Sequence, residues 1–145
     1  MNSPVEAANA VAEHSVYSNA EVEQDIHKWI ESEKARCDLG HAAVRNWNRS
    51  YWLHFYRSCF VKHVRGQVRF REFHPQTFNI VNNRLSASPE LLEVILDMVR
   101  EGAENLPLIW WAFERQHPMD QVIEILEALD INSQRLAPPR DSRDS

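Results

Sequence analysis

Glycine is scarce in this chain, which has three glycines among 145 residues, at positions 40, 66 and 102. Loops that cradle the phosphates of nucleotides need several closely spaced glycines, so that backbone amides can approach the ligand. The three glycines here are widely separated. The sequence therefore excludes a Walker loop and a dinucleotide-binding fingerprint, and we expect each glycine to end a helix.

Cysteine and long apolar runs are also scarce. Cys37 and Cys59 are too few for a disulfide framework, and no signal-peptide pattern precedes them. The longest apolar clusters, such as residues 106–113, are far shorter than the ~20 residues that cross a bilayer. We therefore predict a cytoplasmic protein without a membrane span. Its length is most simply that of one domain with its own core.

Acidic residues are absent from residues 39–71, although the whole chain carries a net charge of −5. The segments before and after it, residues 1–38 and 72–145, are both net acidic. The basic segment therefore either pairs with acidic neighbours inside the fold or meets an anionic partner. Seven of the sixteen basic residues lie in it: Arg45, Arg49, Arg57, Lys62, Arg65, Arg69 and Arg71.

The spacing of apolar residues predicts a mainly α fold, a single-domain bundle of about five helices over residues 18–136. Residues 1–17 are predicted to be a flexible leader and residues 137–145 a disordered tail. Alternating apolar residues around His74-Pro75-Gln76 also allow a small β-hairpin at 67–81. The predicted helices cover residues 18–38, 41–65, 89–101, 107–116 and 119–130.

Two of these helices have apolar faces that should meet the core. In the first, Ser18 to Glu21 matches a capping box, and Val22, Ile26, Trp29 and Ile30 recur at three- and four-residue spacing. In the second, we expect one buried stripe and a central position, because its later turns are apolar on more than one side. That stripe consists of Val44, Trp47, Tyr51, Phe55 and Cys59.

Metal and catalytic sites have weak support. Cys37 and His41 share the spacing of Cys59 and His63, but a helix over 41–65 would place the two histidines about 33 Å apart. One ion could not bind both pairs. No metal ligand, catalytic residue or cofactor is therefore assigned, and a small enzyme or metal-binding protein remains a second alternative. Such a site should gather some of His27, Glu31, His54, His63 and His74 in one pocket.

Nucleic-acid binding by the basic, aromatic helix 41–65 is the first alternative, since cations bind phosphates and aromatic rings stack on bases. On a helical projection, however, Arg45 and Arg49 lie on one flank and Arg57 and Arg65 on another. The charge is spread, and the protein as a whole is acidic. Pairing of these arginines with acids of the first and C-terminal helices is the favoured interpretation.

Trp110 and Trp111 are adjacent, so on a helix their side chains point about 100° apart and are difficult to bury against one surface. Tryptophan is enriched at the energetic centres of interfaces. The sequence therefore favours a non-enzymatic protein-interaction module that uses Trp110 and Trp111 to bind an unknown protein partner or a second copy. Burial of both indoles in the core stays open.

Overall fold

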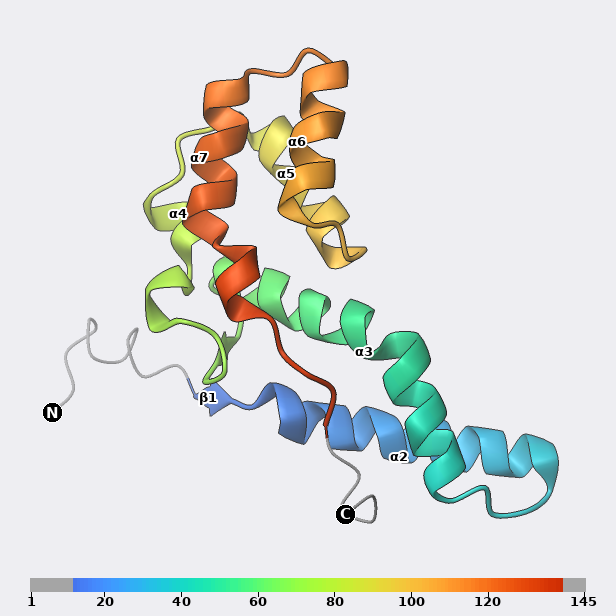
Figure 1. The fold of residues 1–145 in the computed structure, drawn as a ribbon. Helices are drawn as coiled ribbons and strands as arrows, with labels where there is room; N and C mark the ends of the chain where they lie inside the picture. Colours follow the sequence, from blue (N-terminus) through green and yellow to red (C-terminus); the bar gives the residue numbers. More distant parts are fainter. Residues whose placement is uncertain (1–11, 140–145) are drawn as a thin grey trace, which may run out of the picture.

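The computed structural model describes residues 12–139, which form six α-helices, two 3₁₀ turns and a two-stranded parallel sheet (Figure 1). This confirms the predicted mainly α fold. No helix among these residues has the length and apolarity that a bilayer crossing requires. The elements are β1 (Glu13–His14), α2 (Val16–Ala35), α3 (His41–Val64), β2 (Arg69–Phe70), a 3₁₀ turn (Pro75–Thr77), α4 (Ile80–Asn83), α5 (Pro89–Arg100), α6 (Asn105–Glu114), α7 (Met119–Leu129) and a second 3₁₀ turn (Ile131–Gln134).

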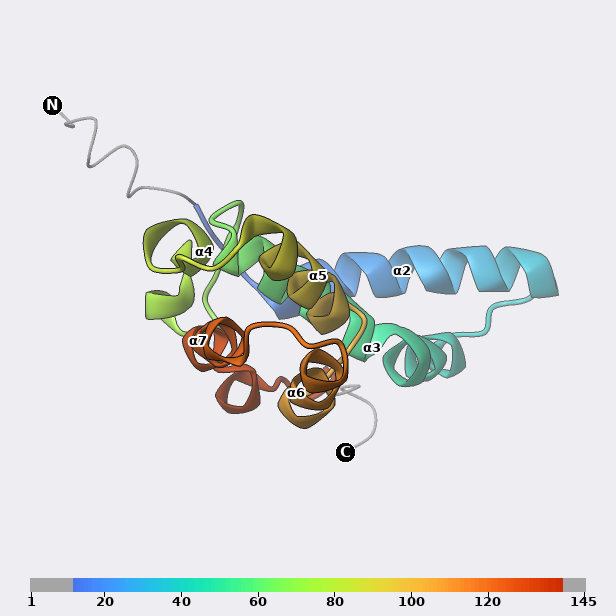
Figure 2. The same ribbon diagram turned by 90° about the horizontal axis from the view of Figure 1, so that it is seen from above.

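The helices are arranged in two parts around α3. Helices α2 and α3 run antiparallel as a hairpin, and α5, α6 and α7 stand on the C-terminal half of α3 (Figures 1 and 2). The turn between α2 and α3 projects away from the other helices in both views. The central position predicted for the second helix therefore applies to the C-terminal half of α3.

Helix α2 begins earlier than predicted, because Ser15 caps it instead of Ser18. The backbone N–H of Ser18 donates to Ser15 Oγ at 3.3 Å. The carboxylate of Glu72 accepts hydrogen bonds from the Ser15 hydroxyl at 2.6 Å and from the Val16 N–H at 2.8 Å. Residues 13–17, assigned above to the leader, thus belong to β1 and α2, whereas residues 1–11 lie outside the described part.

The apolar face of α2 is not the buried one, so the predicted orientation of this helix is wrong. Helix α2 buries Val16, Ala20 and Gln24, and packs on α3. Ala20 is small, which lets the two backbones approach closely. The four residues expected in the core instead face solvent: Val22, Ile26, Trp29 and Ile30.

The predicted stripe of α3 is right only in part. Trp47 and Cys59 are buried, but Tyr51 is half-exposed. The core takes aromatic side chains from the neighbouring positions instead, Trp52, Tyr56 and Phe60. The reason is that the N-terminal half of α3 contacts α2, whereas its C-terminal half contacts α5 and β2 on other sides.

Residues 67–81 do not form the β-hairpin that alternation suggested. Arg69 and Phe70 pair in parallel with Glu13 and His14, and the remainder forms the first 3₁₀ turn and α4. Such a pairing depends on a strand more than fifty residues earlier in the chain, so local alternation could not reveal it.

One arginine lies inside the core and joins α3 to the end of α5. Arg57 is 1% exposed, and its Nη1 donates to the carbonyls of Val99 at 3.1 Å and Ala103 at 2.8 Å. Its Nη2 donates to Glu104 Oε1 at 3.0 Å. Arg57 therefore joins α3 to the turn that follows α5 through charge-assisted hydrogen bonds. The turn there needs Gly102, whose φ is +101° and whose added Cβ would lie 2.9 Å from Leu53.

After the second 3₁₀ turn the chain runs extended along α3 toward α2, and the described part ends at residue 139 (Figure 1). Residues 137–139, assigned above to a disordered tail, make hydrogen bonds to both helices of the hairpin. The rest of that predicted tail, residues 140–145, lies outside the described residues.

Candidate protein-interaction surface

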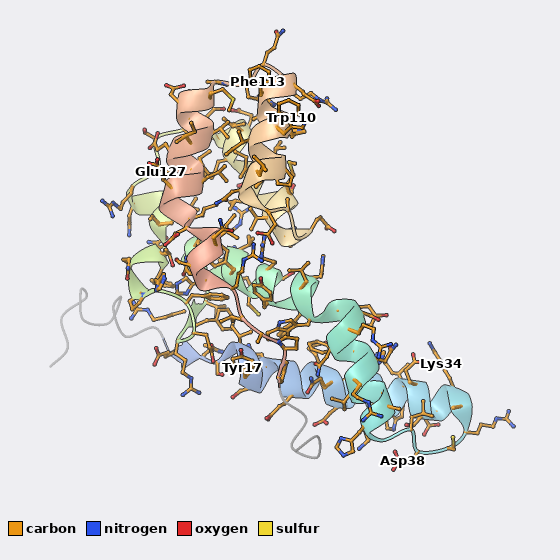
Figure 3. The ribbon with its side chains drawn as sticks, in the orientation of Figure 1. Tyr17, Lys34, Asp38, Trp110, Phe113 and Glu127 are labelled. Carbon is orange, nitrogen blue, oxygen red and sulfur yellow. The ribbon has the colours of Figure 1, made fainter. Side chains whose placement is uncertain are left out.

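Helix α6 carries three large apolar side chains toward solvent. Leu106, Trp110 and Phe113 lie at positions i, i+4 and i+7 and are 75%, 63% and 63% exposed. The rings of Trp110 and Phe113 stack with their centroids 6.0 Å apart and their planes 7° apart. The opposite side of the helix buries Leu108 and Ala112 completely. We call Leu106, Trp110 and Phe113 the α6 face; it lies far from Tyr17 on α2 (Figure 3).

The two adjacent tryptophans have different surroundings. Trp110 points to solvent, whereas Trp111 is partly buried against the core. The Trp111 ring lies against the imidazole of His117, with centroids 4.7 Å apart. The structure thus separates the two predicted interaction residues, and the exposed surface around Trp110 is completed by Leu106 and Phe113.

Sequence reasoning did not assign Leu106 and Phe113 to this surface. The signal available was their spacing from Trp110, which places all three on one helix face. The spacing did not single out one face as exposed, because residues 106–113 are apolar on nearly every side of the helix. Without a neighbouring helix to compare with, no side could be chosen as the exposed one.

A second exposed apolar face lies on α2 and has the same spacing. It consists of Val22, Ile26, Trp29 and Ile30, of which Trp29 is 65% exposed. Its exposed neighbours Glu23 and Asp25 are acidic. Because α2 and α6 occupy opposite ends of the molecule, the two faces are separate surfaces (Figure 1).

Among the basic candidates, Arg57 and Arg65 are engaged with acids. Arg57 is in the core, bound to Glu104. Arg65 forms a bidentate pair with Glu93, with Nη1 at 2.8 Å from Oε1 and Nη2 at 2.6 Å from Oε2. The hydrogen bond from Arg65 holds the pKa of Glu93 below its usual value. Both arginines therefore have the internal pairing that the sequence favoured.

The other five basic candidates do not gather into one patch. The Arg69 guanidinium lies over the Phe78 ring, 4.5 Å from its centroid. Arg45 and Arg49 are exposed on the projecting half of α3, and Lys62 is exposed near its other end. Arg49 and Lys62 are separated by about 20 Å along the helix. Arg71, also exposed, follows β2. Nucleic-acid binding stays a prediction.

The two cysteines have different surroundings. Burial raises the pKa of the Cys59 thiol to about 12, so this thiol stays protonated at neutral pH and is a poor nucleophile. Cys37 is exposed. Residues 12–139 contain no group of three or more His, Cys, Asp or Glu side chains placed to hold a metal ion.

Of the five residues expected in an enzyme pocket, His63 and His74 are in contact, with His63 Nε2 3.1 Å from the His74 carbonyl. The other three have other partners, and Glu31 pairs with Lys34 at 3.4 Å. A His27 ring nitrogen lies 3.2 Å from Asn46 Oδ1, and His54 lies 3.7 Å from Glu101. His63 is buried, and His74 bonds Ser133. His74 also lines a groove of about 550 Å³, whose other charged residues are Arg84, Asp120, Glu124, Glu127 and Asp130.

Comparison with known proteins adds no identification: no family model, no curated protein and no solved structure matches this chain. The chemistry of its surface is therefore the basis for assigning a function.

Proposed function

We propose that this protein is a non-enzymatic interaction module that inserts the α6 face into an apolar groove of a partner protein. The observation that carries the proposal is the exposure of Leu106, Trp110 and Phe113 on one side of a helix whose other side is fully packed. Large apolar side chains in contact with water are unfavourable, and a contiguous exposed group of them is typical of a binding surface.

The spacing and shape of the α6 face favour a groove as its receptor. Anchors at i, i+4 and i+7 are those of a helix that lies in a hydrophobic groove. Two copies of the face would meet along a line, because both are convex. The three side chains offer roughly 450 Å² per partner, well below the ~800 Å² of a standard interface. A groove that surrounds the helix would bury more surface on each side.

The face is also rigid before binding. Leu108 and Ala112 anchor the helix in the core, and stacking holds the rings of Trp110 and Phe113 together. Little side-chain freedom is therefore left to lose on binding, which increases affinity for a given area.

The test begins by identifying the partner through a photo-crosslinking amino acid at position 106, in cells that make the protein. The partner is then purified, and its affinity for the full chain is measured by calorimetry. We expect Trp110→Ala to weaken binding by about 30-fold or more, as for a central aromatic anchor. Trp29→Ala is the matched control, because Trp29 has almost the same exposure at the other end of the molecule. It should leave the affinity unchanged.

Two results would contradict the proposal. Equal loss of affinity in both tryptophan variants would show that the α6 face is not the specific site. Crosslinks that join only copies of this chain, with a dimer in light scattering, would make the occupant a second copy.

A further inference from the structure

The end of the described chain lies on the α2–α3 hairpin as a bound peptide would. We call residues 135–139 the strap. Three side chains donate hydrogen bonds to its carbonyls: Trp52 Nε1 to Leu136 at 2.8 Å, Tyr17 Oη to Ala137 at 2.8 Å, and Asn48 Nδ2 to Pro139 at 3.3 Å. Figure 1 shows the strap descending from α7 across α3 to α2.

The three donors form a prepared surface, here called the strap site. The rings of Tyr17 and Trp52 stack, with centroids 5.5 Å apart and planes 17° apart, and present a flat aromatic wall. Asn48 is oriented by Gln24, a buried residue whose Nε2 donates to Asn48 Oδ1 at 2.6 Å. The donors are therefore held in place by α2 and α3, independently of the strap.

The donors of the strap site bind the backbone of the occupant, because each hydrogen bond that they make is accepted by a main-chain carbonyl. The residues before Pro138 and Pro139 are confined to extended conformations, and each proline ring sets its own φ. Arg135, with φ −73° and ψ 134°, is already in the polyproline II region. Aromatic walls with donors aimed at carbonyls are the chemistry by which proteins recognise polyproline II segments.

The strap is held by side-chain contacts: besides the three donors, its Leu136 packs partly buried against the core. Within the described residues it makes no backbone–backbone hydrogen bond. The chain just before it is anchored by Gln134, a buried residue whose Nε2 donates to the Leu129 carbonyl at 2.7 Å. Displacement would therefore involve residues 136–139 of the strap and stop at Arg135, which pairs with Glu104 at 2.9 Å.

We propose that Tyr17, Asn48 and Trp52 form a binding site for an extended, proline-containing segment of a partner protein, and that the chain's own strap occupies this site as an internal competitor. A tethered occupant acts at a high effective concentration, so a free peptide binds only by displacing it. The apparent affinity is then reduced by the small fraction of molecules whose site is open. Release of the strap would increase that fraction.

The test uses the full chain and a capped synthetic peptide with the sequence of residues 135–139. The readout is the indole N–H resonance of Trp52 in NMR spectra. The double variant Pro138→Gly/Pro139→Gly weakens the strap, since glycine is far less confined to the extended conformation. We expect its Trp52 resonance to move away from the wild-type position and to return when the peptide is added. The peptide should bind this variant at least about tenfold more tightly than wild type.

Two matched controls measure separately what the donors and the prolines contribute to the affinity for the peptide. Adding Tyr17→Phe to the double variant removes one hydroxyl donor and keeps the ring, so the peptide should bind about three- to tenfold more weakly. A peptide with glycine at both proline positions should bind less tightly than the proline peptide. Equal binding of both peptides, or peptide binding that leaves the Trp52 resonance unmoved, would overturn the proposal.

Two further outcomes of the same experiment would also overturn it. If the double variant loses its cooperative thermal unfolding transition, the strap is part of the core and not a displaceable ligand. If it forms a concentration-dependent dimer whose Trp52 resonance is already at the wild-type position, the natural occupant is the strap of a second copy.

Discussion

His63 is buried and uses both of its ring nitrogens. Its Nδ1 accepts a hydrogen bond from the Phe70 N–H at 3.1 Å, and its Nε2 lies 3.1 Å from the His74 carbonyl, to which it donates. This pair of bonds fits the neutral ring with its proton on Nε2. Burial lowers the pKa of His63, and the nearby positive charge of Arg69 lowers it further.

The stability of the protein should therefore decrease on acidification. The unfolded chain binds a proton at His63 below its ordinary pKa of 6.5, whereas the folded state resists that proton. We expect the free energy of unfolding to be unaffected by His63 above about pH 6.5 and to fall below it, by at most ~1.4 kcal/mol per pH unit. Urea denaturation between pH 7.5 and 5 measures this dependence.

The control variants for this prediction are His63→Gln and His54→Gln. The first removes the buried titrating group and should reduce the slope below pH 6.5, even though it lowers stability at every pH. The second changes an exposed histidine and is the matched control for loss of an imidazole outside the core. An unchanged slope in His63→Gln would assign the effect to other groups.

The arginines show that charge alone does not determine whether a residue is buried or exposed. Arg57 and Arg49 lie in the same acid-free segment, yet Arg57 is in the core and Arg49 is at the surface. The difference is that the end of α5 and the turn after it bring two carbonyls and Glu104 to Arg57. These partners lie more than forty residues away in sequence.

At the scale of the element, α2 and α6 show that an apolar stripe does not identify the buried side of a helix. Each carries apolar residues at i, i+4 and i+7 that face solvent. Helix α2 packs on α3 through Val16, Ala20 and Gln24, and its outer side meets no other described element. Burial depends on which side has a neighbour, and here the less apolar side has one.

The exposure of this face of α2 predicts losses of stability of very different size for two tryptophans that the sequence placed in the core. Trp29→Ala should change the free energy of unfolding by no more than about 0.5 kcal/mol, because Trp29 is exposed. Trp47→Ala should lower it by about 3–5 kcal/mol, because Trp47 is buried among Trp52 and Phe55. Urea denaturation followed by circular dichroism measures both. Similar losses would mean that the outer face of α2 is covered in solution.

At the scale of the whole molecule, burial is uneven along its length. Helices α5 and α7 each bury at least four apolar residues around the C-terminal half of α3. In contrast, α2 has no buried residue after Gln24, and its second half lies on the projecting part of the hairpin (Figure 2). Local opening is easiest where few apolar contacts must be broken.

The protection of amides from hydrogen exchange should therefore differ between the two parts of the molecule. We expect amides of residues 28–35 in α2 to have protection factors at least about a hundredfold lower than those around Ile95 and Leu96 in α5. The measurement is native-state exchange by NMR. It is repeated at several protein concentrations, because protection that comes from self-association would increase with concentration. Equal protection in the two helices would contradict this picture and would indicate that the hairpin end is covered by another surface.

Five of the six helices among the described residues could be predicted from the sequence, because helix formation depends on local features, whereas α4 was not predicted. The serine and proline that begin α5 and the glycines that follow α3 and α5 are readable within a few residues. Only the tertiary structure decided which faces are buried, how Glu72 caps α2, where β2 pairs and that the strap lies on Tyr17 and Trp52. The Glu72 cap, the pairing of β2 and the strap contacts each join residues more than fifty positions apart, whose meeting follows from packing and leaves no periodic pattern in the chain. The α6 face lies between these cases: its spacing is in the sequence, but its exposure is a property of the fold.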